Sequence, residues 1–232
     1  MKPDLYFLHL KNIPINEQLS LEETLLRNDT RNFCLVNHGA PPAIVVGQTG
    51  QIEDLLSPSF LKTPTLPVFR RFSAGGTVVI DQNTLFLTFI CQKGTLSIPP
   101  YPEAILKWTE KALKPALSHS SFCALDNDYT IEQKKCGGNA QYISQNRWLH
   151  HSSLLWDYDP ILMDILLLPK KMPSYRKERP HGMFLHPLKD CIPKEAFIEA
   201  LFHSLKTWFK VQKMPLSDLP RPLSSPSTKK LL

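Results

Sequence analysis

The chain has no cysteine pattern that would hold a zinc ion or a set of disulfide bonds. Its five cysteines are scattered, and no Cys-x-x-Cys pair occurs. Zinc sites and small disulfide-rich domains need clustered or evenly paired cysteines. Scattered cysteines in odd number are typical of proteins that stay in a reducing compartment. The cysteine spacing therefore predicts a cytoplasmic protein without a metal site of its own.

Long apolar runs and targeting signals are also missing. No run approaches the roughly 20 apolar residues that a helix needs to cross a bilayer, and the N-terminus has no basic region followed by an apolar core. The net charge of +6 is dispersed and accompanies no recognised nucleic-acid-binding motif. We therefore expect neither a membrane nor a nucleic acid as the partner, whereas a basic surface also suits an acidic protein.

The composition allows a sizeable hydrophobic core. The chain has 232 residues, of which 42% are hydrophobic and 21% are charged, so disorder of the whole chain is not expected. Residues 1–212 are predicted to form one domain. Residues 213–232 are rich in proline and serine, which predicts a flexible tail.

Hydrophobic periodicity places helices and strands along this domain. Amphipathic spacing predicts helices over residues 16–27 and 103–113 and a further helix that begins at Pro193. Asn16 is expected to cap the first helix. Runs of β-branched and apolar residues predict strands over 5–10, 33–36, 43–46, 67–69, 77–80, 85–90, 139–144 and 147–156.

A pair of arginines followed by a small-residue segment lies between two of these strands. Arg70 and Arg71 precede Phe-Ser-Ala and then Gly75 and Gly76. Glycines let the backbone turn sharply and approach a ligand closely. Exposed N–H groups in such a segment suit an anion, and arginine can fork onto phosphate or carboxylate. The segment therefore suggests an anion site, with an ordinary hairpin as the alternative.

A second polar stretch places a lysine before another pair of glycines. Lys135 precedes Cys-Gly-Gly-Asn-Ala, which is expected to form a turn. His150 and His151 follow on a predicted strand. Adjacent residues on a strand point to opposite faces, so the two histidines are poor joint ligands for one metal ion.

Taken together, these stretches resemble the lipoate–protein ligase A family of the biotin/lipoate ligase superfamily. The family pattern falls on Arg70–Gly76, Asn127-Asp128, Lys135–Ala140 and His150-His151, in the same order and with similar spacing. The resemblance covers about residues 4–210. It implies an α+β fold, in which a mixed, mostly antiparallel central sheet is flanked by helices, like the catalytic domain of class II synthetase-related biotin and lipoate ligases.

The resemblance also implies a two-step activity with ATP, Mg²⁺ and lipoate. ATP and lipoate give lipoyl-adenylate and pyrophosphate, and a lysine of an acceptor lipoyl domain then takes the lipoyl group. The implied acceptors are the lipoyl domains of 2-oxoacid dehydrogenase complexes or the H protein of glycine cleavage. Some relatives also use a separate accessory domain protein, which makes such a protein a further expected partner.

Lys135 is the residue for which the resemblance implies a catalytic role. A fixed ammonium there would contact both the acyl carboxylate and the α-phosphate and stabilise the charge that gathers between them. The implied contacts of ATP and the adenylate are Arg71, Gly75, Gly76, Thr77, Val78, Val79, Asp128 and Lys135. The implied contacts of lipoate are Arg70, Lys135, Gly138, Asn139, Ala140 and His151.

Departures from the family pattern keep other functions open. Ala74 stands where the family usually has a glycine, and Ile80 stands where many members have histidine. Cys136 follows the lysine directly, and a thiolate there with a depressed pKa would allow octanoyl or lipoyl transfer without ATP. Transfer only from a preformed lipoyl-adenylate, biotin ligation and a non-enzymatic binding role are the remaining alternatives.

Overall fold

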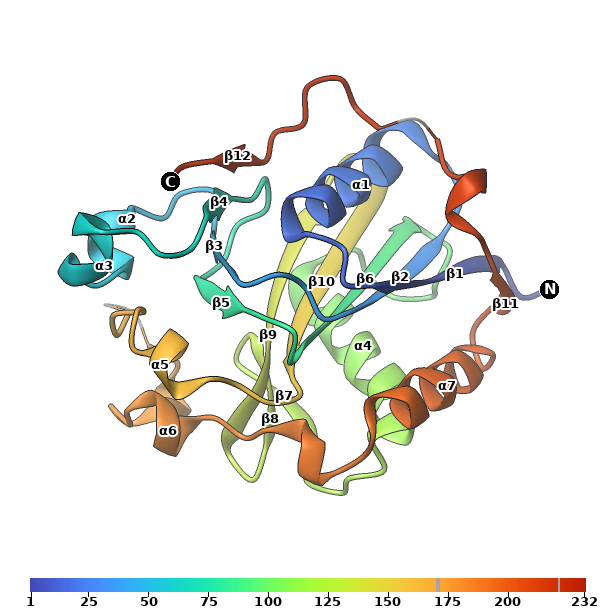
Figure 1. Cartoon of the computed structure of the whole chain (residues 1–232). Coiled ribbons are helices and arrows are strands. Elements are labelled where there is room, and N and C mark those ends of the chain that lie inside the picture. Colours follow the sequence, from blue (N-terminus) through green and yellow to red (C-terminus); the bar gives the residue numbers. More distant parts are fainter. Residues whose placement is uncertain (170–171, 221) are drawn as a thin grey trace.

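Most of the chain folds around one large sheet. The computed structural model describes residues 1–169, 172–220 and 222–232. The sheet has eight strands in the order β11-β1-β2-β6-β10-β9-β8-β7 (Figure 1). Strand β1 pairs in parallel with β2 and β11, and all other neighbours are antiparallel. The strands are β1 (Asp4–Lys11), β2 (Phe33–His38), β6 (Thr84–Gln92), β7 (Cys123–Leu125), β8 (Asp128–Ile131), β9 (Lys134–Ile143), β10 (Arg147–Leu155) and β11 (Lys210–Lys213).

Helices cover both faces of this sheet, as the predicted α+β architecture requires. On one face, α4 (Pro102–Leu117) and α7 (Lys194–Leu205) share the largest hydrophobic cluster with the strands. On the other face, α1 (Ile15–Asn28) packs Leu25 and Leu26 in a cluster with residues of β1 and β2 (Figure 1). The predicted helices are confirmed, although α1 begins at Ile15 after Pro14 and has no side-chain cap, so the expected capping role of Asn16 is wrong.

A smaller sheet carries the arginine–glycine segment. Its order is β12-β4-β3-β5, formed by β3 (Ala43–Val46), β4 (Val68–Arg70), β5 (Val78–Ile80) and β12 (Lys229–Lys230). Strands β4 and β5 flank β3 on opposite sides, β4 in parallel and β5 antiparallel. Residues 71–77 therefore cross from one side of β3 to the other, and the alternative of a simple hairpin is wrong.

Short helices surround the small sheet and the lower end of the large one. The elements α2 (Ile52–Leu55), α3 (Pro58–Lys62) and α5 (Pro160–Met163) lie beside the small sheet, with α6 (His181–Phe184) below α5 (Figure 1). Single 3-10 turns are η1 (Ser174–Arg176), η2 (Leu188–Asp190) and η3 (Leu216–Asp218). In the described part of the chain, no helix combines the length and the apolar character needed to cross a membrane.

The proline- and serine-rich C-terminal segment runs back over α1 to the small sheet (Figure 1). Ser227 donates its N–H and its hydroxyl to the carboxylate of Glu23, at 2.7 and 2.6 Å. Strand β12 then pairs antiparallel with β4, and Leu231 joins the cluster beneath the small sheet. The segment thus adds the edge strand next to the strand that carries Arg70.

Candidate functional site

Arg71 places a buried positive charge at the start of the crossing segment. Its side chain is 6% exposed. The guanidinium donates to the Ser73 hydroxyl at 3.1 Å and to the carbonyl of Ala74 at 3.0 Å, and no carboxylate forms an ion pair with it among the described residues. Burial lowers the pKa of Arg71 to about 10, a shift that the charge of Glu22 opposes. A buried cation without a paired carboxylate is well suited to receive an anionic ligand.

Arg70 has a different role in this structure. Its Nη1 donates to the carbonyls of Gly47, Gln48 and Gly50, at 3.3, 3.1 and 2.6 Å. These bonds hold the loop after β3 against the end of β4. Arg70 therefore braces the backbone around the site, and its expected contact with lipoate stays a prediction.

Glycine is required at position 75 by both backbone conformation and space. Gly75 has a φ of +111°, and an added Cβ would lie 2.7 Å from Nη2 of Arg71 and 3.3 Å from the Cβ of Ala140. Gly47 approaches the carbonyl of Gly75 so closely that a side chain there would collide with it. The crossing segment is therefore packed directly against β9 and the loop after β3.

The crossing segment also presents unused donors. None of the hydrogen bonds of the described residues is donated by the backbone N–H groups of residues 74–77. The hydroxyl of Thr77 is buried without a partner among these residues. Oriented N–H groups beside a guanidinium form the kind of concavity that binds phosphate or carboxylate. Val78 and Val79, in contrast, pack into hydrophobic clusters on the two faces of the small sheet.

A buried chain of hydrogen bonds supports the segment from behind. The Ser73 hydroxyl contacts Nε2 of His151 at 2.9 Å, and Nδ1 of His151 contacts the Glu22 carboxylate at 2.9 Å. Glu22 is fully buried and also accepts from Gln18 and Thr88. His151 thus links α1 to the crossing segment. The sequence placed His151 at the site but did not indicate this partner on α1.

Lys135 lies on strand β9, so the predicted glycine turn after it is wrong. Residues 137–143 pair with β10, and β8 pairs with β9 through an irregularity at Cys136. Nζ of Lys135 forms an ion pair with Oδ1 of Asp128 at 2.8 Å. An added Cβ at Gly138 would lie 3.3 Å from this Nζ, so the glycine leaves room for the lysine side chain above the strand.

The two polar stretches meet along β9. Lys135 lies over Gly138, and Ala140 further along the strand faces Gly75, which touches Arg71. Between them, Asn139 donates to the carbonyl of Asn127 and accepts from Ser152. Tertiary structure therefore brings Lys135, Gly75 and Arg71 to neighbouring positions along β9, although they come from two different sheets.

Cys136 has none of the properties of a nucleophile. Its side chain is fully buried in the cluster beneath the large sheet. Burial raises the pKa of its thiol, with smaller contributions from nearby Cys191 and Asp128. The expected depression of its pKa by Lys135 is wrong, because burial has the largest effect on the thiol and raises its pKa.

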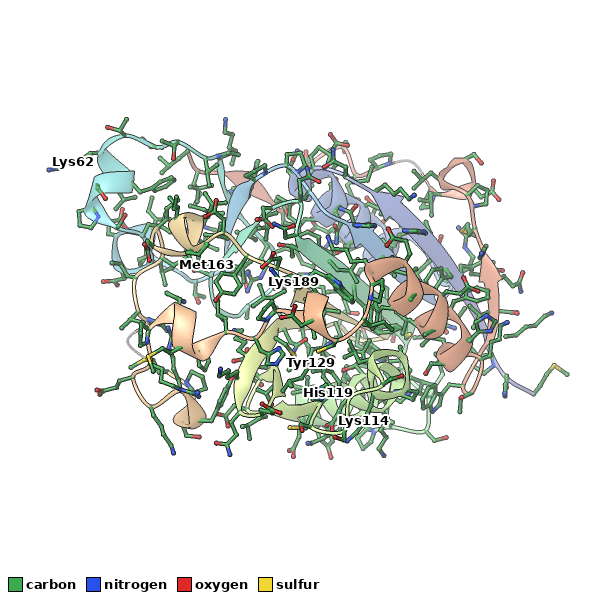
Figure 2. All side chains as sticks on the ribbon, turned by 60° about the horizontal axis from the view of Figure 1, so that its bottom comes forward. Lys62, Lys114, His119, Tyr129, Met163 and Lys189 are labelled. Atoms are coloured by element: carbon green, nitrogen blue, oxygen red, sulfur yellow. The ribbon has the colours of Figure 1, made fainter. Side chains whose placement is uncertain are left out.

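His150 is a buried structural residue. Its ring contacts the hydroxyl of Tyr129 at 3.1 Å and the side chain of Gln141 at 2.9 Å. Tyr129 projects from the hairpin next to α4 (Figure 2) and donates to Thr109 on that helix. Burial lowers the pKa of His150 to about 3, so the ring is neutral. It therefore connects the sheet to α4 and does not contact the site.

Tyr175 is a site residue that the sequence did not indicate. Its hydroxyl donates to Oδ2 of Asp128 at 2.8 Å, while Lys135 occupies Oδ1. It comes from the irregular basic segment 173–181, whose functional meaning could not be derived from composition. No local pattern marks this tyrosine, because its partner lies far away in the chain.

Where the small sheet meets β9 of the large one, the buried Arg71 and nearby Lys135 gather positive charge of the kind that suits an anionic ligand. A sequence match to the lipoyl protein ligase A/B catalytic domain extends over residues 14–210. The chain therefore belongs to this family, which confirms the predicted relationship.

Similar proteins agree with this assignment. The "Inactive lipoate--protein ligase 2" of Plasmodium falciparum is 28% identical, covering 87% of this chain and 69% of that protein. A solved bi-partite lipoate protein ligase of Thermoplasma acidophilum, studied with its E2 lipoyl domain, has a TM-score of 0.74 at 16% identity and covers 92% of this chain and 88% of its own. A solved lipoate-protein ligase A bound with ATP has a TM-score of 0.72 at 15% identity, and the match covers 93% of this chain and 90% of that one.

These likenesses confirm the predicted fold. They also show a difference in length, because the chain spans only 34% and 46% of two bacterial ligases that it matches.

Proposed function

We propose that this chain is an ATP-dependent lipoate–protein ligase that forms lipoyl-adenylate and transfers the lipoyl group to a lysine of a lipoyl domain. The buried Arg71 guanidinium carries this proposal. A desolvated cation is costly unless an opposite charge is present, and Arg71 has no carboxylate partner among the described residues. An anionic acyl-adenylate would supply that charge next to the free N–H groups of residues 74–77.

Lys135 is placed to serve the chemical step. In adenylation, a carboxylate oxygen of lipoate attacks the α-phosphorus of ATP and pyrophosphate leaves. The ammonium of Lys135 would offset the repulsion between the two anions and stabilise the charge that develops between them. In transfer, the acceptor amine attacks the acyl carbonyl and AMP leaves, which forms the amide and releases one proton.

Mg²⁺ fits the site only in company with nucleotide phosphates. No cluster of three or more potential ligands occurs among the described residues, and Asp128 is the carboxylate next to Lys135. Mg²⁺ commonly takes one or two carboxylates together with waters and substrate phosphates. When bound it would neutralise phosphate charge. Each Asp128 oxygen already has one partner, Lys135 or Tyr175, and each keeps a lone pair that a metal ion could use.

The ATP-independent alternative loses its nucleophile. Cys136 is fully buried and burial raises the pKa of its thiol. Transfer from a preformed lipoyl-adenylate is the second candidate, and two likenesses favour it. One relative is described as inactive, and one structural neighbour is described as bi-partite, which suits an activating step that needs a second protein.

The proposed acceptor is an acidic lipoyl domain. The net charge of +6 suits such a partner, and the Thermoplasma acidophilum neighbour is described together with its E2 lipoyl domain. The lipoyl domains of 2-oxoacid dehydrogenase complexes and the glycine cleavage H protein are the acceptors we propose. The reducing cytoplasm is the proposed compartment.

Intact-mass spectrometry of the acceptor tests the proposal. Protein, Mg²⁺, lipoate and a purified lipoyl domain are incubated with and without ATP, and a parallel sample receives lipoyl-adenylate. Lipoylation that depends on ATP is expected, with loss in Lys135→Ala and retention in Lys134→Ala, its exposed neighbour. Modification only from lipoyl-adenylate would establish the transfer-only candidate. No modification in any sample would overturn both.

A further inference from the structure

Tyr175 and Lys135 bind the two different oxygens of the Asp128 carboxylate. The Asp128 carboxylate receives the Tyr175 hydroxyl at one oxygen and the Lys135 ammonium at the other, each at 2.8 Å. The Asp128 side chain is 12% exposed and that of Lys135 is 25% exposed. Because each oxygen has its own donor, the carboxylate has one orientation, and that orientation determines where the ammonium lies.

The tyrosine itself is fixed by contacts to the same hairpin. Ser174 donates its N–H to Asp126 at 3.1 Å, in the turn between β7 and β8. Arg179 donates to the carbonyl of Gln133 at 2.8 Å, in the turn between β8 and β9. The Tyr175 ring packs on Phe184 with a centroid distance of 5.3 Å. These contacts hold the Tyr175 ring where its hydroxyl reaches Asp128.

The segment that carries Tyr175 also binds the backbone of Lys135. The N–H of His186 donates to the carbonyl of Lys135 at 2.8 Å, and Leu185 forms a parallel bridge with Lys135. Segment 174–186 thus restrains the lysine twice, through its backbone and through Asp128. Burial, together with the nearby Asp128 charge, raises the pKa of Tyr175, so its hydroxyl remains a donor at neutral pH.

We propose that Tyr175 is a positioning residue, whose hydroxyl orients Asp128 so that the Lys135 ammonium stays above Gly138, facing the surface that leads to Gly75 and Arg71. This inference rests on the proposed function, in which that surface receives the acyl-adenylate. Without the hydroxyl, Asp128 is free to rotate and to hold the ammonium with both oxygens. The lysine is then less available to the anionic ligand.

A double-mutant cycle on ligand affinity tests this role. The probe is a non-hydrolysable lipoyl-sulfamoyl adenosine, and its dissociation constant is measured by calorimetry. Tyr175→Phe keeps the ring and is expected to weaken binding about tenfold, within the range for a hydrogen bond to a charged group. In an Asp128→Asn background, which cannot form the ion pair, Tyr175→Phe is expected to have no further effect.

Tyr158→Phe is the matched control. Tyr158 packs in the same hydrophobic cluster, and its hydroxyl makes no hydrogen bond to a described residue. It should bind the probe as the wild type does. Full affinity in Tyr175→Phe, or additive losses in the double variant, would overturn the positioning role.

A second readout needs no ligand and separates this inference from the proposed function. The acetylation rate of Lys135 by an amine-reactive ester is measured by peptide mass spectrometry, with Lys134 as the internal reference. Tyr175→Phe is expected to slow Lys135 relative to Lys134 at least threefold, and only when Asp128 is present. If the wild type fails to bind the probe, the proposed function fails, and an unchanged acetylation ratio would then overturn the role of Tyr175 as well.

Discussion

Replacing Gly75 by alanine should destabilise the protein far more than the same change at Gly76. Gly75 has a φ of +111°, and its new Cβ would lie 2.7 Å from Nη2 of Arg71. The backbone term costs about 1–2 kcal/mol for an L-residue in left-handed space. Moving a buried guanidinium off its preferred rotamer adds roughly 1 kcal/mol. The expected loss is therefore about 2–3 kcal/mol of unfolding free energy.

Gly76 is the matched control for stability. It has no positive φ, and no atom lies within 4 Å of an added Cβ. Differential scanning calorimetry should show a drop in Tm of about 4–12 °C for Gly75→Ala, since 1 kcal/mol shifts a domain of this size by roughly 2–4 °C. Equal shifts in the two variants, or no shift in Gly75→Ala, would refute the reasoning about the crossing segment.

Three further predictions follow from buried groups. Cys136→Ser should retain acyl transfer, because the buried thiol does not react; loss of transfer at unchanged fold, seen by intact mass and circular dichroism, would contradict this. Burial lowers the pKa of His150 to about 3, whereas an unfolded histidine titrates near 6.5. The unfolded chain alone takes up this proton between those values, so stability should fall as pH drops below 6.5, by up to about 1.4 kcal/mol per pH unit. Urea unfolding at pH 7.5 and 5.0 should show that this pH dependence shrinks in His150→Gln, and an unchanged dependence would count against a neutral ring. Ser227→Ala removes a donor from the buried Glu23 carboxylate and should cost about 1–2 kcal/mol in chemical unfolding, while Ser224→Ala serves as the control and should cost nothing measurable.

Local patterns predicted the elements of this fold well. Strands β1, β2, β3 and β6 and helices α1 and α4 lie close to the predicted ranges, because amphipathic periodicity reports which face of an element is buried. Trp108, on the buried face of the predicted helix over residues 103–113, is 4% exposed and lies in the largest hydrophobic cluster. The family relationship was also readable, since it depends on motif order.

Predictions about the segments that connect the strands were less successful. The glycines after Lys135 were expected in a turn, yet they continue strand β9, where pairing with β8 and β10 outweighs their weak strand propensity. A hairpin was the alternative structure predicted for the segment after Arg71. The strands that flank this segment, β4 and β5, do not pair with each other, because β3 lies between them. A strand inserted between two sequence neighbours leaves no local signal.

Local sequence patterns were enough to predict most of the helices and strands, the family and the candidate charged and glycine residues. Which of these groups come into contact could be seen only once the chain was folded. The tertiary structure separated Arg71, buried beside Gly75, from Arg70, which braces the loop after β3. It also buried Cys136 and brought Tyr175 to Asp128. The physical reason is that charge pairing and desolvation depend on distances of a few ångströms in space, and residues remote in the chain reach such distances only after the sheets have formed.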